Sequence, residues 1–400
     1  MAMKLIDISP SANKTANTRV PGSCFVLFCN PERERARYFA YANCVTLGSS
    51  PICLPWTRVI LGDIPWRQLS KGDFVLRLES PGKNWLVEKE ILKIGAREAD
   101  EENGPWRTLT HKQACGIEND PGRVWPMRAW FLGWRRILKR IAAAAGPKAR
   151  WMNPPCNVIA MFDKAESDRR IAAIGATVPE TLGIPVCFDD LHARMTSARR
   201  SRVFLKPCHG SSASGVVALE MSGDRMQAWS TLEFVTKEGE LRLYNNRRVQ
   251  IYRGVNEVRA LVDAVCRERS VAQAWWPKAG WRGKRFDLRV VVIDGRARHV
   301  VPRLSSMPFT NLQLGAERGE PDELRREVGE ENWARMLAEC ERAAAAFPGN
   351  LYCTFDVLVS PGWRRFAIAE ANAFGDLLNG FRHEGKDTYM TEIHAYTHRG

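Results

Sequence analysis

Apolar residues in the first part of the chain form short continuous runs that alternate with segments at helical spacing. The runs at 24–29 and 73–79 are bounded by glycine, proline or serine and are followed by helical patterns at 32–46 and 85–97. Strands that alternate with helices in this way predict a small α/β domain. The first twenty residues are polar and rich in Ser, Asn and Thr, which predicts a flexible arm.

A longer helix is predicted over residues 127–146, where it ends at Gly146-Pro147. Its apolar residues form one stripe and its basic residues lie largely off it: Trp130, Trp134, Ile137 and Ile141 against Arg135, Arg136, Lys139 and Arg140. A basic amphipathic helix can bind nucleic acid or a membrane surface. A surface helix that packs such a stripe on the protein body is commoner, so we expect packing.

The second half of the chain is predicted to be rich in strands. Residues 202–219 form a strand, a loop of small residues and a second strand, while Asp294-Gly295 joins two β-branched runs and predicts a primed hairpin turn. The remaining elements predicted here are strands over 229–235, 240–244 and 250–252, helices over 256–267 and 321–346, and an apolar run over 271–276.

Two apolar runs near the end of the chain, 353–360 and 366–375, flank the turn signal Pro361-Gly362 and predict paired strands. Asp356 interrupts the first run, and Glu370 and Asn372 stand two apart in the second, so these two project from one face. Two carboxylates and an amide oxygen suit Mg²⁺. Solvated acids at strand ends and a turn asparagine would explain the same residues equally well.

Composition narrows the function classes. The 400 residues are 45% hydrophobic and 26% charged, which is typical of a globular protein with two or three domains. Eleven scattered cysteines without a C-x-x-C pair argue against a disulfide framework and a zinc ribbon, and favour reduced thiols in the cytoplasm. The net charge of +14 indicates an anionic partner. We find no signal-peptide pattern and expect no membrane span.

The loop from Gly210 to Gly215 has the glycine spacing of a phosphate-binding P-loop, but Val216 and Val217 replace the lysine and hydroxyl residue that such a loop needs. Its small residues could still hold phosphate through backbone N–H groups and serine hydroxyls, with Lys206 as a nearby charge. A plain hairpin loop with a surface lysine is the alternative, and for this segment taken alone it is the better explanation. His209 is placed to contact phosphate, although a hydrogen bond within the loop would explain it equally well.

Taken in order, the loop, Asp287-Leu-Arg289, Asn311, Asp356 and Glu370-x-Asn372 resemble the ATP-grasp superfamily. The resemblance covers about residues 157–395. It is closest to the ribosomal-protein glutamate ligases and related carboxylate–amine ligases, and the ending at 370–378 is most similar to a bacterial ATP-grasp family.

The resemblance implies a role for each matching residue. Arg289 and Arg303 would be catalytic, and Asp356, Glu370 and Asn372 would bind magnesium, with two ions possible and Mn²⁺ as a substitute. The residues assigned to nucleotide binding, by the resemblance or by the loop pattern, are Lys164, Lys206, His209, Gly210, Ser211, Ser212, Ser214, Gly215, Gln273, Ala274, Trp275, Lys278, Asp287 and Asn311.

The implied fold class is α/β (α+β), an ATP-grasp fold preceded by an N-terminal α/β pre-grasp domain. We expect an arm at 1–20, the pre-grasp-like domain at 21–125, a helical connector at 126–156 and the ATP-grasp domain at 157–400, with its lid lobe at about 175–272. Arg77, Glu79 and the loop Ser80-Pro-Gly could face a substrate from the first domain, although an ordinary strand end accounts better for that loop.

The implied activity is ATP- and Mg²⁺-dependent, ADP-forming ligation of a carboxylate to an amine through an acyl phosphate. Alternatives are an ATP-grasp kinase that stops at phosphoryl transfer and a non-catalytic nucleotide-binding regulator. A nucleic-acid binder ranks last, since no recognition motif accompanies the charge. Ala373-Phe374 stands where many ligases have Pro-Gly, so the resemblance identifies neither the acid nor the amine, and the oligomeric state stays open.

Overall fold

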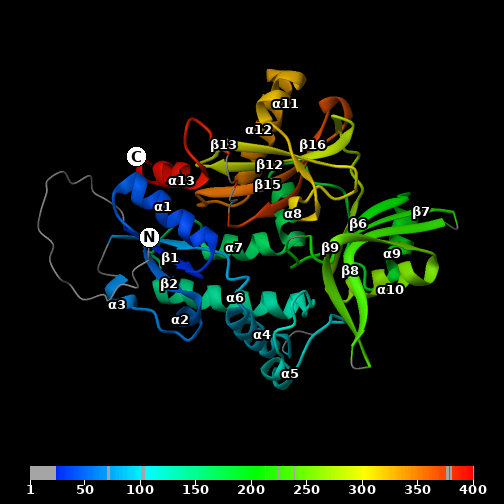
Figure 1. The fold of residues 1–400 in the computed structure, drawn as a ribbon, viewed down its shortest axis with the longest axis horizontal. Coiled ribbons are helices and arrows are strands. Elements are labelled where there is room, and N and C mark those ends of the chain that lie inside the picture. The colour runs from blue at the N-terminus through cyan, green and yellow to red at the C-terminus, as the bar shows by residue number, and fades with distance from the viewer. Residues whose placement is uncertain are drawn as a thin grey trace, which may run out of the picture.

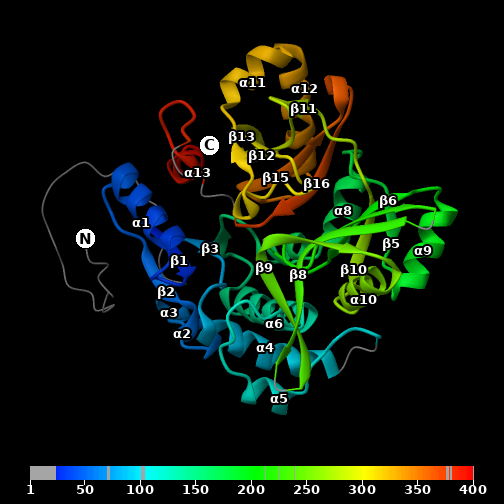
Figure 2. The same ribbon diagram turned by 45° about the vertical axis from the view of Figure 1, so that its right-hand side comes forward.

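The computed structural model describes residues 24–69, 73–100, 104–211, 213–223, 225–237, 239–374, 378 and 381–399. The predicted arm over residues 1–20 lies outside these ranges. Within them the chain forms three sheets, one from the N-terminal third and two from the remainder, and Figures 1 and 2 show all three.

The N-terminal sheet is parallel, with the strand order β2-β1-β3-β4. The strands and helices predicted at 24–29, 32–46, 73–79 and 85–97 are confirmed. The strands are β1 (Cys24–Cys29), β2 (Ile52–Pro55), β3 (Phe74–Leu78) and β4 (Arg150–Trp151). The helices of this region are α1 (Glu34–Leu47), α2 (Trp56–Ile60), α3 (Trp66–Leu69), α4 (Trp85–Asp100), α5 (His111–Gly116) and α6 (Met127–Ala145).

Helix α6 packs its apolar stripe inward, as predicted. Trp134 is fully buried and meets Trp56 edge to face at a centroid distance of 4.9 Å. Helix α6 crosses α4 so closely that a Cβ atom at Gly133 would lie 1.9 Å from the Ile91 carbonyl oxygen, and one at Gly95 would lie 1.7 Å from that of Ala129. The tryptophan stripe is therefore used for packing, and the crossing requires both glycines.

The second sheet, here called the lid sheet, is antiparallel with the order β5-β10-β6-β7-β8-β9. Its strands are β5 (Thr181–Gly183), β6 (Arg202–Pro207), β7 (Val217–Ser222), β8 (Arg225–Lys237), β9 (Glu240–Arg253) and β10 (Ser270–Ala274). Helices α9 (Phe188–Ser197) and α10 (Val255–Cys266) pack against it, while α7 (Pro155–Phe162) and α8 (Lys164–Ala173) precede it.

The two strands predicted at 240–244 and 250–252 are one strand in the structure. The polar residues between them lie inside β9, at an irregularity between the pairs Leu232–Asn245 and Ser230–Gln250. The prediction of a break was wrong because a bulge accommodates unpaired polar residues without ending the strand.

The C-terminal sheet has the order β14-β13-β12-β15-β16, with β11 paired to β12. Its strands are β11 (Gly280–Trp281), β12 (Lys284–Ile293), β13 (Arg296–Ser305), β14 (Glu317–Arg318), β15 (Tyr352–Val359) and β16 (Phe366–Asn372). Its helices are α11 (Pro321–Val328), α12 (Glu330–Ala344) and α13 (Thr388–Thr397), and the single 3₁₀ turns are η1 (Leu312–Leu314) and η2 (Pro361–Trp363).

Residues with positive φ confirm one prediction in this region and explain why another was wrong. Asp294 and Gly295 both have positive φ, 52° and 69°, which confirms the primed turn predicted between β12 and β13. The single helix predicted over 321–346 is broken into α11 and α12 at Gly329, whose φ is 83°. Glycine adopts this conformation without steric cost, so a helix can end there despite continuous apolar spacing.

The buried residues are divided unevenly among the three sheets. One core joins the N-terminal sheet to the face of the C-terminal sheet that α12 covers, for example Phe28 to Phe286 and Phe355. The lid sheet has a separate core with α9 and α10, which includes Leu205 and Leu261. None of the helices placed by the structure has the length and apolar character needed to cross a membrane.

Candidate active site

The polar side chains of the candidate site form a regular grid on one face of the C-terminal sheet. Strand register places Arg289 on β12, Asp356 on β15 and Glu370 on β16 directly opposite one another in a single row. Asp287 lies two residues from Arg289 and pairs with Arg303 on β13. Directly opposed residues have Cα atoms about 4.5–5.5 Å apart, so the sheet itself brings these groups together.

A bulge in β16 makes this row possible. Asp356 pairs with Glu370, but the next residue, Val357, pairs with Ile368, so Ala369 is an extra residue. Ile368 is buried in the shared core, and strict alternation would turn Glu370 toward that same core. The bulge turns Glu370 to the polar face, and the Ala369 carbonyl accepts a hydrogen bond of 3.2 Å from the Lys206 ammonium.

Asp356 is held by two arginines. Arg289 donates to both of its carboxylate oxygens, from Nε at 2.7 Å and from Nη2 at 3.0 Å, and Arg303 Nη2 lies 3.0 Å from Oδ2. Burial alone would raise the pKa of Asp356, but the two guanidinium groups hold it well below its usual range. Asp356 is therefore ionised throughout the neutral pH range.

Arg303 also connects this carboxylate to a second acid. Its Nε donates to Asp287 Oδ1 at 2.8 Å, and Asp287 Oδ2 accepts from the Thr310 hydroxyl. Lys278 Nζ lies 3.0 Å from the Thr310 hydroxyl oxygen and 3.8 Å from Asp287. Burial lowers the pKa of Lys278, and Asp287 opposes that shift. The predicted catalytic arginines and Lys278 thus belong to one connected network.

Lys164 joins the same face of the sheet to the loop from Gly210 to Gly215, here called the lid loop. Its Nζ donates to the Gly210 carbonyl at 2.5 Å and lies 3.2 Å from Glu370 Oε1. The residue begins α8, where the Asp163 side chain caps the helix by accepting from the amides of Ala165 and Glu166. One lysine therefore contacts both the predicted phosphate loop and a predicted magnesium ligand.

Lys206 lies on β6 close to two acids, Glu370 and Asp168. Burial lowers the pKa of Lys206, whereas the two carboxylates work against that shift. Asp168 is buried and accepts from Gln273 Nε2 at 2.5 Å. Its pKa is raised to about 6 by burial, although Lys206 lowers it. A carboxyl group that loses its negative charge below about pH 6 thus lies beside the lysine predicted to bind phosphate.

Aromatic side chains gather where β6 pairs with β10 and the chain continues to Trp275. Trp275 lies 4.8 Å from Phe204 and 6.2 Å from Trp229 between ring centroids, and Phe204 also contacts Phe309 at 6.1 Å. Ala274 is bound through its backbone amide to the Glu180 carbonyl at 2.8 Å. The segment 273–275, which was predicted to bind the nucleotide, thus lies beside flat apolar surfaces suited to a nucleobase.

The lid loop is a tight turn between β6 and β7. Ser214 N donates to the Ser211 carbonyl at 2.9 Å, and Gly215 has a φ of 73°, where a Cβ atom would meet Pro207 Cγ at 2.9 Å. Ser211 is exposed and Ser214 half-buried. Ser212, also predicted to contact phosphate, lies outside the described residues.

His209 is buried away from solvent behind the lid loop. Its imidazole stacks on Phe131 at 4.0 Å, and its Nε2 lies 3.3 Å from Asp163 Oδ2, which also accepts from Arg269 at 2.9 Å. Burial lowers the pKa of His209 to about 4. This geometry supports the alternative of a local hydrogen bond, here to Asp163, over a phosphate contact.

The side chain of Asn311 likewise binds a neighbouring residue. Its side-chain oxygen accepts from the Gln313 amide at 2.8 Å and so caps the 3₁₀ turn η1.

Arg77 and Glu79, considered as substrate-facing residues, are buried. Arg77 donates to Glu79 at 2.8 Å and to Glu392 of α13 at 2.5 Å. This pair thus joins β3 to the C-terminal helix α13.

Three residues that sequence reasoning missed support the site. Asp168 is one helical turn after Lys164, a spacing that already indicates one helix face. Thr310 binds Asp287. Asn153 donates to the carbonyls of Tyr352 and Ala373 and accepts from the Leu351 and Tyr352 amides, which ties β15 to the segment after Asn372. Nothing in the sequence around Asn153 points to this contact.

Several buried polar atoms at the site have no hydrogen-bond partner among the described residues. They are Gln273 Oε1, Asn372 Nδ2 and the Thr354 hydroxyl, and Thr354 pairs with Asn372 across the strands. Buried polar groups are normally satisfied, so unsatisfied ones indicate a missing ligand or water. The described residues contain no cluster of three or more His, Cys, Asp or Glu side chains placed to hold a metal ion. The oxygen set of Asp356, Glu370 and Asn372 nevertheless fits Mg²⁺, which needs few protein ligands.

Comparison with known proteins supports the fold. The sequence matches no known protein-family profile and no curated protein. The crystal structure of D-cycloserine synthetase DcsG is similar, with 14% identity and a TM-score of 0.53 over 94% of this chain and 99% of that one. A RimK domain ATP-grasp protein from Sphaerobacter thermophilus is also 14% identical, with a TM-score of 0.47 over 94% and 99% of the two chains. The macrocyclase MdnC from Microcystis aeruginosa, bound to precursor peptide MdnA, is 11% identical, with a TM-score of 0.48 over 93% and 98%. The likeness to DcsG supports the ATP-grasp fold that the sequence resemblance implied, with helices and sheets mixed along the described residues.

Proposed function

We propose that this protein is an ATP- and Mg²⁺-dependent ligase that joins a carboxylate to an amine and releases ADP and phosphate. The observation that carries the proposal is the meeting of Lys164, Lys206, Arg289 and Arg303 with Asp356 and Glu370 between the lid loop and the C-terminal sheet. The neighbour of similar fold is named as a synthetase, which agrees with ligation.

The charge balance of the site suits a nucleotide triphosphate. Its basic side chains are Lys164, Lys206, Lys278, Arg289 and Arg303, whereas its acids are Asp168, Asp287, Asp356 and Glu370. Because Asp168 titrates near pH 6, the balance becomes more positive when that residue is protonated. A polyanion with a divalent cation would complete such a site, since phosphoryl transfer relies mainly on positioning and charge neutralisation.

Asp356, Glu370 and Asn372 would hold the magnesium ion, which supplies charge neutralisation at the phosphate oxygens when bound. At present Asp356 is occupied by two arginines and Glu370 by Lys164. When the nucleotide binds, Lys164, Arg289 and Arg303 would exchange their carboxylate partners for the phosphates. Until then the ion pairs keep these cations and the two carboxylates in position. Lys206, whose hydrogen bond among the described residues goes to the Ala369 carbonyl and not to a carboxylate, would turn to phosphate at little cost.

The proposed reaction has two steps. The substrate carboxylate attacks the γ-phosphorus of ATP, the bond to ADP breaks, and an acyl phosphate forms. The amine then attacks the acyl carbon, phosphate leaves with the bonding electron pair, and the amine loses a proton. Arg289 and Arg303 would stabilise the phosphate oxygens during transfer, and the lid loop would exclude water from the acyl phosphate. The acid and the amine remain to be identified.

Hydroxylamine trapping tests this chemistry directly. Purified protein is incubated with Mg-ATP, pools of carboxylic acids and hydroxylamine, and both ADP and hydroxamate are measured. A ligase yields hydroxamate together with ADP, because hydroxylamine intercepts an acyl phosphate whichever amine is natural. Arg303→Lys should lower trapping more than ATP binding, and Arg296→Lys, at an exposed position on the same strand, serves as the matched control.

Two other outcomes distinguish the alternatives. A stable phosphorylated product that resists hydroxylamine would identify a kinase. Mg-ATP binding without ADP release across all acids tested would identify a non-catalytic nucleotide binder. The intact network of Arg289, Arg303 and Asp356 favours turnover over the latter.

A further inference from the structure

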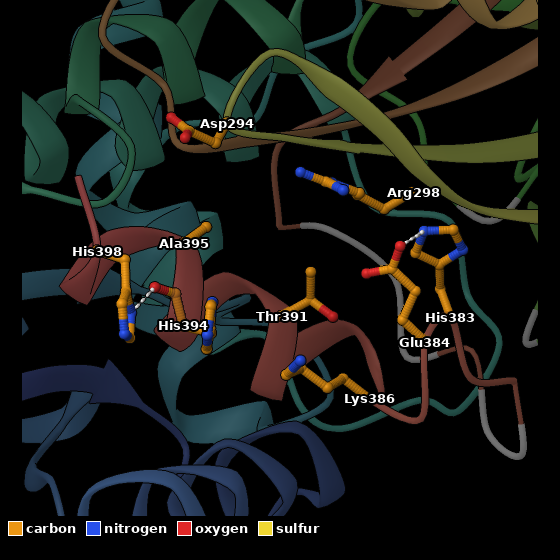
Figure 3. Close-up of a pocket in the computed structure, with 9 residues that line it drawn as sticks. All are labelled: Asp294, Arg298, His383, Glu384, Lys386, Thr391, His394, Ala395 and His398. Atoms are coloured by element: carbon orange, nitrogen blue, oxygen red, sulfur yellow. Dashed lines mark hydrogen bonds and ion pairs between the residues drawn. The ribbon is translucent and has the colours of Figure 1, made fainter. Parts of the chain in front are cut away.

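A cavity of about 240 Å³ lies on the outer side of the C-terminal region, between α13 and the turn end of the β12–β13 hairpin (Figure 3). Four of the protein's seven histidines are in or beside it. The residues that line it are Asp294, Arg298, His383, Glu384, Lys386, Thr391, His394, Ala395 and His398. Arg298 is five residues from Arg303 along β13, or about 17 Å at the usual strand rise, so the cavity is separate from the candidate active site.

Two half-buried cations face this cavity without an acidic partner. Arg298 and the Lys386 ammonium form no hydrogen bond or ion pair with any residue the structure describes, whereas Arg289, Arg296 and Arg303 of the same sheet each have a carboxylate partner. Partial burial of an unpaired charge is unfavourable because it loses hydration without gaining an opposite charge. Such cations indicate a binding site for an anion.

The backbone directs both cations to the cavity. Val291 pairs with His299 and Val292 with Ala297, so Arg298 is the extra residue of a bulge in β13. A bulge changes the direction of a side chain relative to the regular strand. Lys386 lies on a tight turn bound back to His383, and the His299 imidazole donates to the Lys386 carbonyl at 3.1 Å. The two charges thus have fixed positions on neighbouring elements.

Two histidines of α13 also line the cavity. His394 and His398 are one helical turn apart and stack at 4.0 Å, and neither nitrogen of His394 has a partner among the described residues. Partial burial, His398, Lys386 and Arg298, in that order, lower the pKa of His394. The charges around this imidazole are therefore mainly positive.

The acids of the cavity do not cancel this charge. Asp294 is paired with Arg399 at 2.6 Å, and Asp387, next to Lys386, caps α13 by accepting from the Met390 amide. Glu384 is exposed and lies 3.8 Å from His383. A metal ion at the His394–His398 pair would face Arg298 and Lys386, and no third metal-binding residue joins the pair within the described ranges. Electrostatics therefore favours an anion over a cation.

We propose that this cavity binds a phosphate-type dianion, held by Arg298 and Lys386 with His394 as a further donor, at a site distinct from the candidate active site. Two full cations on separate elements match the charge of a dianion better than that of a single carboxylate. The proposal does not depend on the proposed ligase activity.

The test is a titration of the full-length protein with inorganic phosphate, followed by NMR of its histidine imidazoles at constant ionic strength. The His394 and His398 signals should shift saturably with phosphate and not with chloride. Arg298→Ala and Lys386→Ala should each weaken this binding at least fivefold. Arg296→Ala, on the same strand but paired with Glu341, is the matched control and should leave it unchanged.

Three outcomes would overturn the proposal: no saturable shift with phosphate, equal binding by the variants and the wild type, or acetate binding as tightly as phosphate. Saturable binding of Zn²⁺ at His394 and His398 that phosphate does not prevent would instead identify a metal site. Lys206→Ala should not alter the shifts, because phosphate bound at the active site lies too far from α13 to account for them.

Discussion

The two sheets that flank the candidate site contribute to it in different ways. The C-terminal sheet presents Arg289, Asp356 and Glu370 as one row set by strand register and held by ion pairs. The lid sheet contributes a strand-end lysine and a serine loop, and its buried core is separate from the core that the other two sheets share. The candidate site thus combines a row of ion-paired side chains on the C-terminal sheet with a lid sheet that has its own separate core.

This difference agrees with what the proposed ligase reaction would require of each half. Charges that act on a transferred phosphate have to be positioned in advance, and a paired sheet does this because every residue is fixed by its neighbours. A lid has to open and close, so it should be joined to the rest by few and exchangeable contacts. The bonds from Lys206 to the Ala369 carbonyl and from Lys164 to the Gly210 carbonyl are contacts of this kind.

The largest effect is expected at the centre of the grid. Asp356→Asn removes the charge that the buried Arg303 and the half-buried Arg289 share, which should lower the free energy of unfolding by about 3–5 kcal/mol. It should also abolish turnover. Chemical denaturation and ADP release measure the two effects, and Asp294→Asn, an exposed acid on the same sheet, is the control. Unchanged stability would show that the grid is not held by this charge.

Glu370→Gln should affect chemistry without comparable loss of stability, since Glu370 is half-buried and contacts only Lys164 among the described ion pairs. Turnover should fall about 10²–10³-fold. Binding of the adenine nucleotide, measured by calorimetry, should remain within a few-fold of the wild type. An equally large loss of nucleotide affinity would mean that the carboxylate acts mainly in binding and not in the reaction.

Asp168 should make stability depend on pH. Its pKa is about 6 in the folded protein and 3.8 as a free side chain, so the folded state binds the extra proton between these values. Stability should therefore fall as pH rises from about 4 to 6, by at most about 3 kcal/mol. Asp168→Asn should remove this slope in denaturation curves measured across that range.

Glu166→Gln, on the same helix, provides the opposite test. The pKa of Glu166 is lowered by its hydrogen bond to Arg169, so this residue contributes stability that is lost as pH falls. If both variants changed the slope in the same direction, the assignment of the two shifts would be wrong.

Lys206→Ala tests the lid side and should have the smallest effect of the four. The charged hydrogen bonds of one lysine are worth about 1.5–3 kcal/mol, so nucleotide binding should weaken about 10–100-fold while folding is little changed. Thermal shift with Mg-ADP provides the measurement. Arg202→Ala, on the same strand but exposed, is the matched control. Weaker binding in the control alone would contradict the assignment.

The sequence alone indicated many of the strands and helices and several residues of the candidate site. Period-two alternation, the Asp294-Gly295 turn and the order of Asp287, Arg289, Asp356 and Glu370 are local patterns, and local patterns persist in the fold because backbone geometry enforces them. The resemblance added the ATP-grasp fold, which the structural comparison supports. The nucleotide and metal roles of these residues remain predictions.

Tertiary structure alone decided the features that depend on register and burial. The bulges at Ala369 and Arg298 shift the side-chain alternation by one residue, and such a shift is set by the partner strand and not by the residue itself. The burial of His209 and the raised pKa of Asp168 arise because distant segments close around them. Short-range patterns cannot contain this information, since the free energy of a polar group depends on which surfaces surround it in the folded chain.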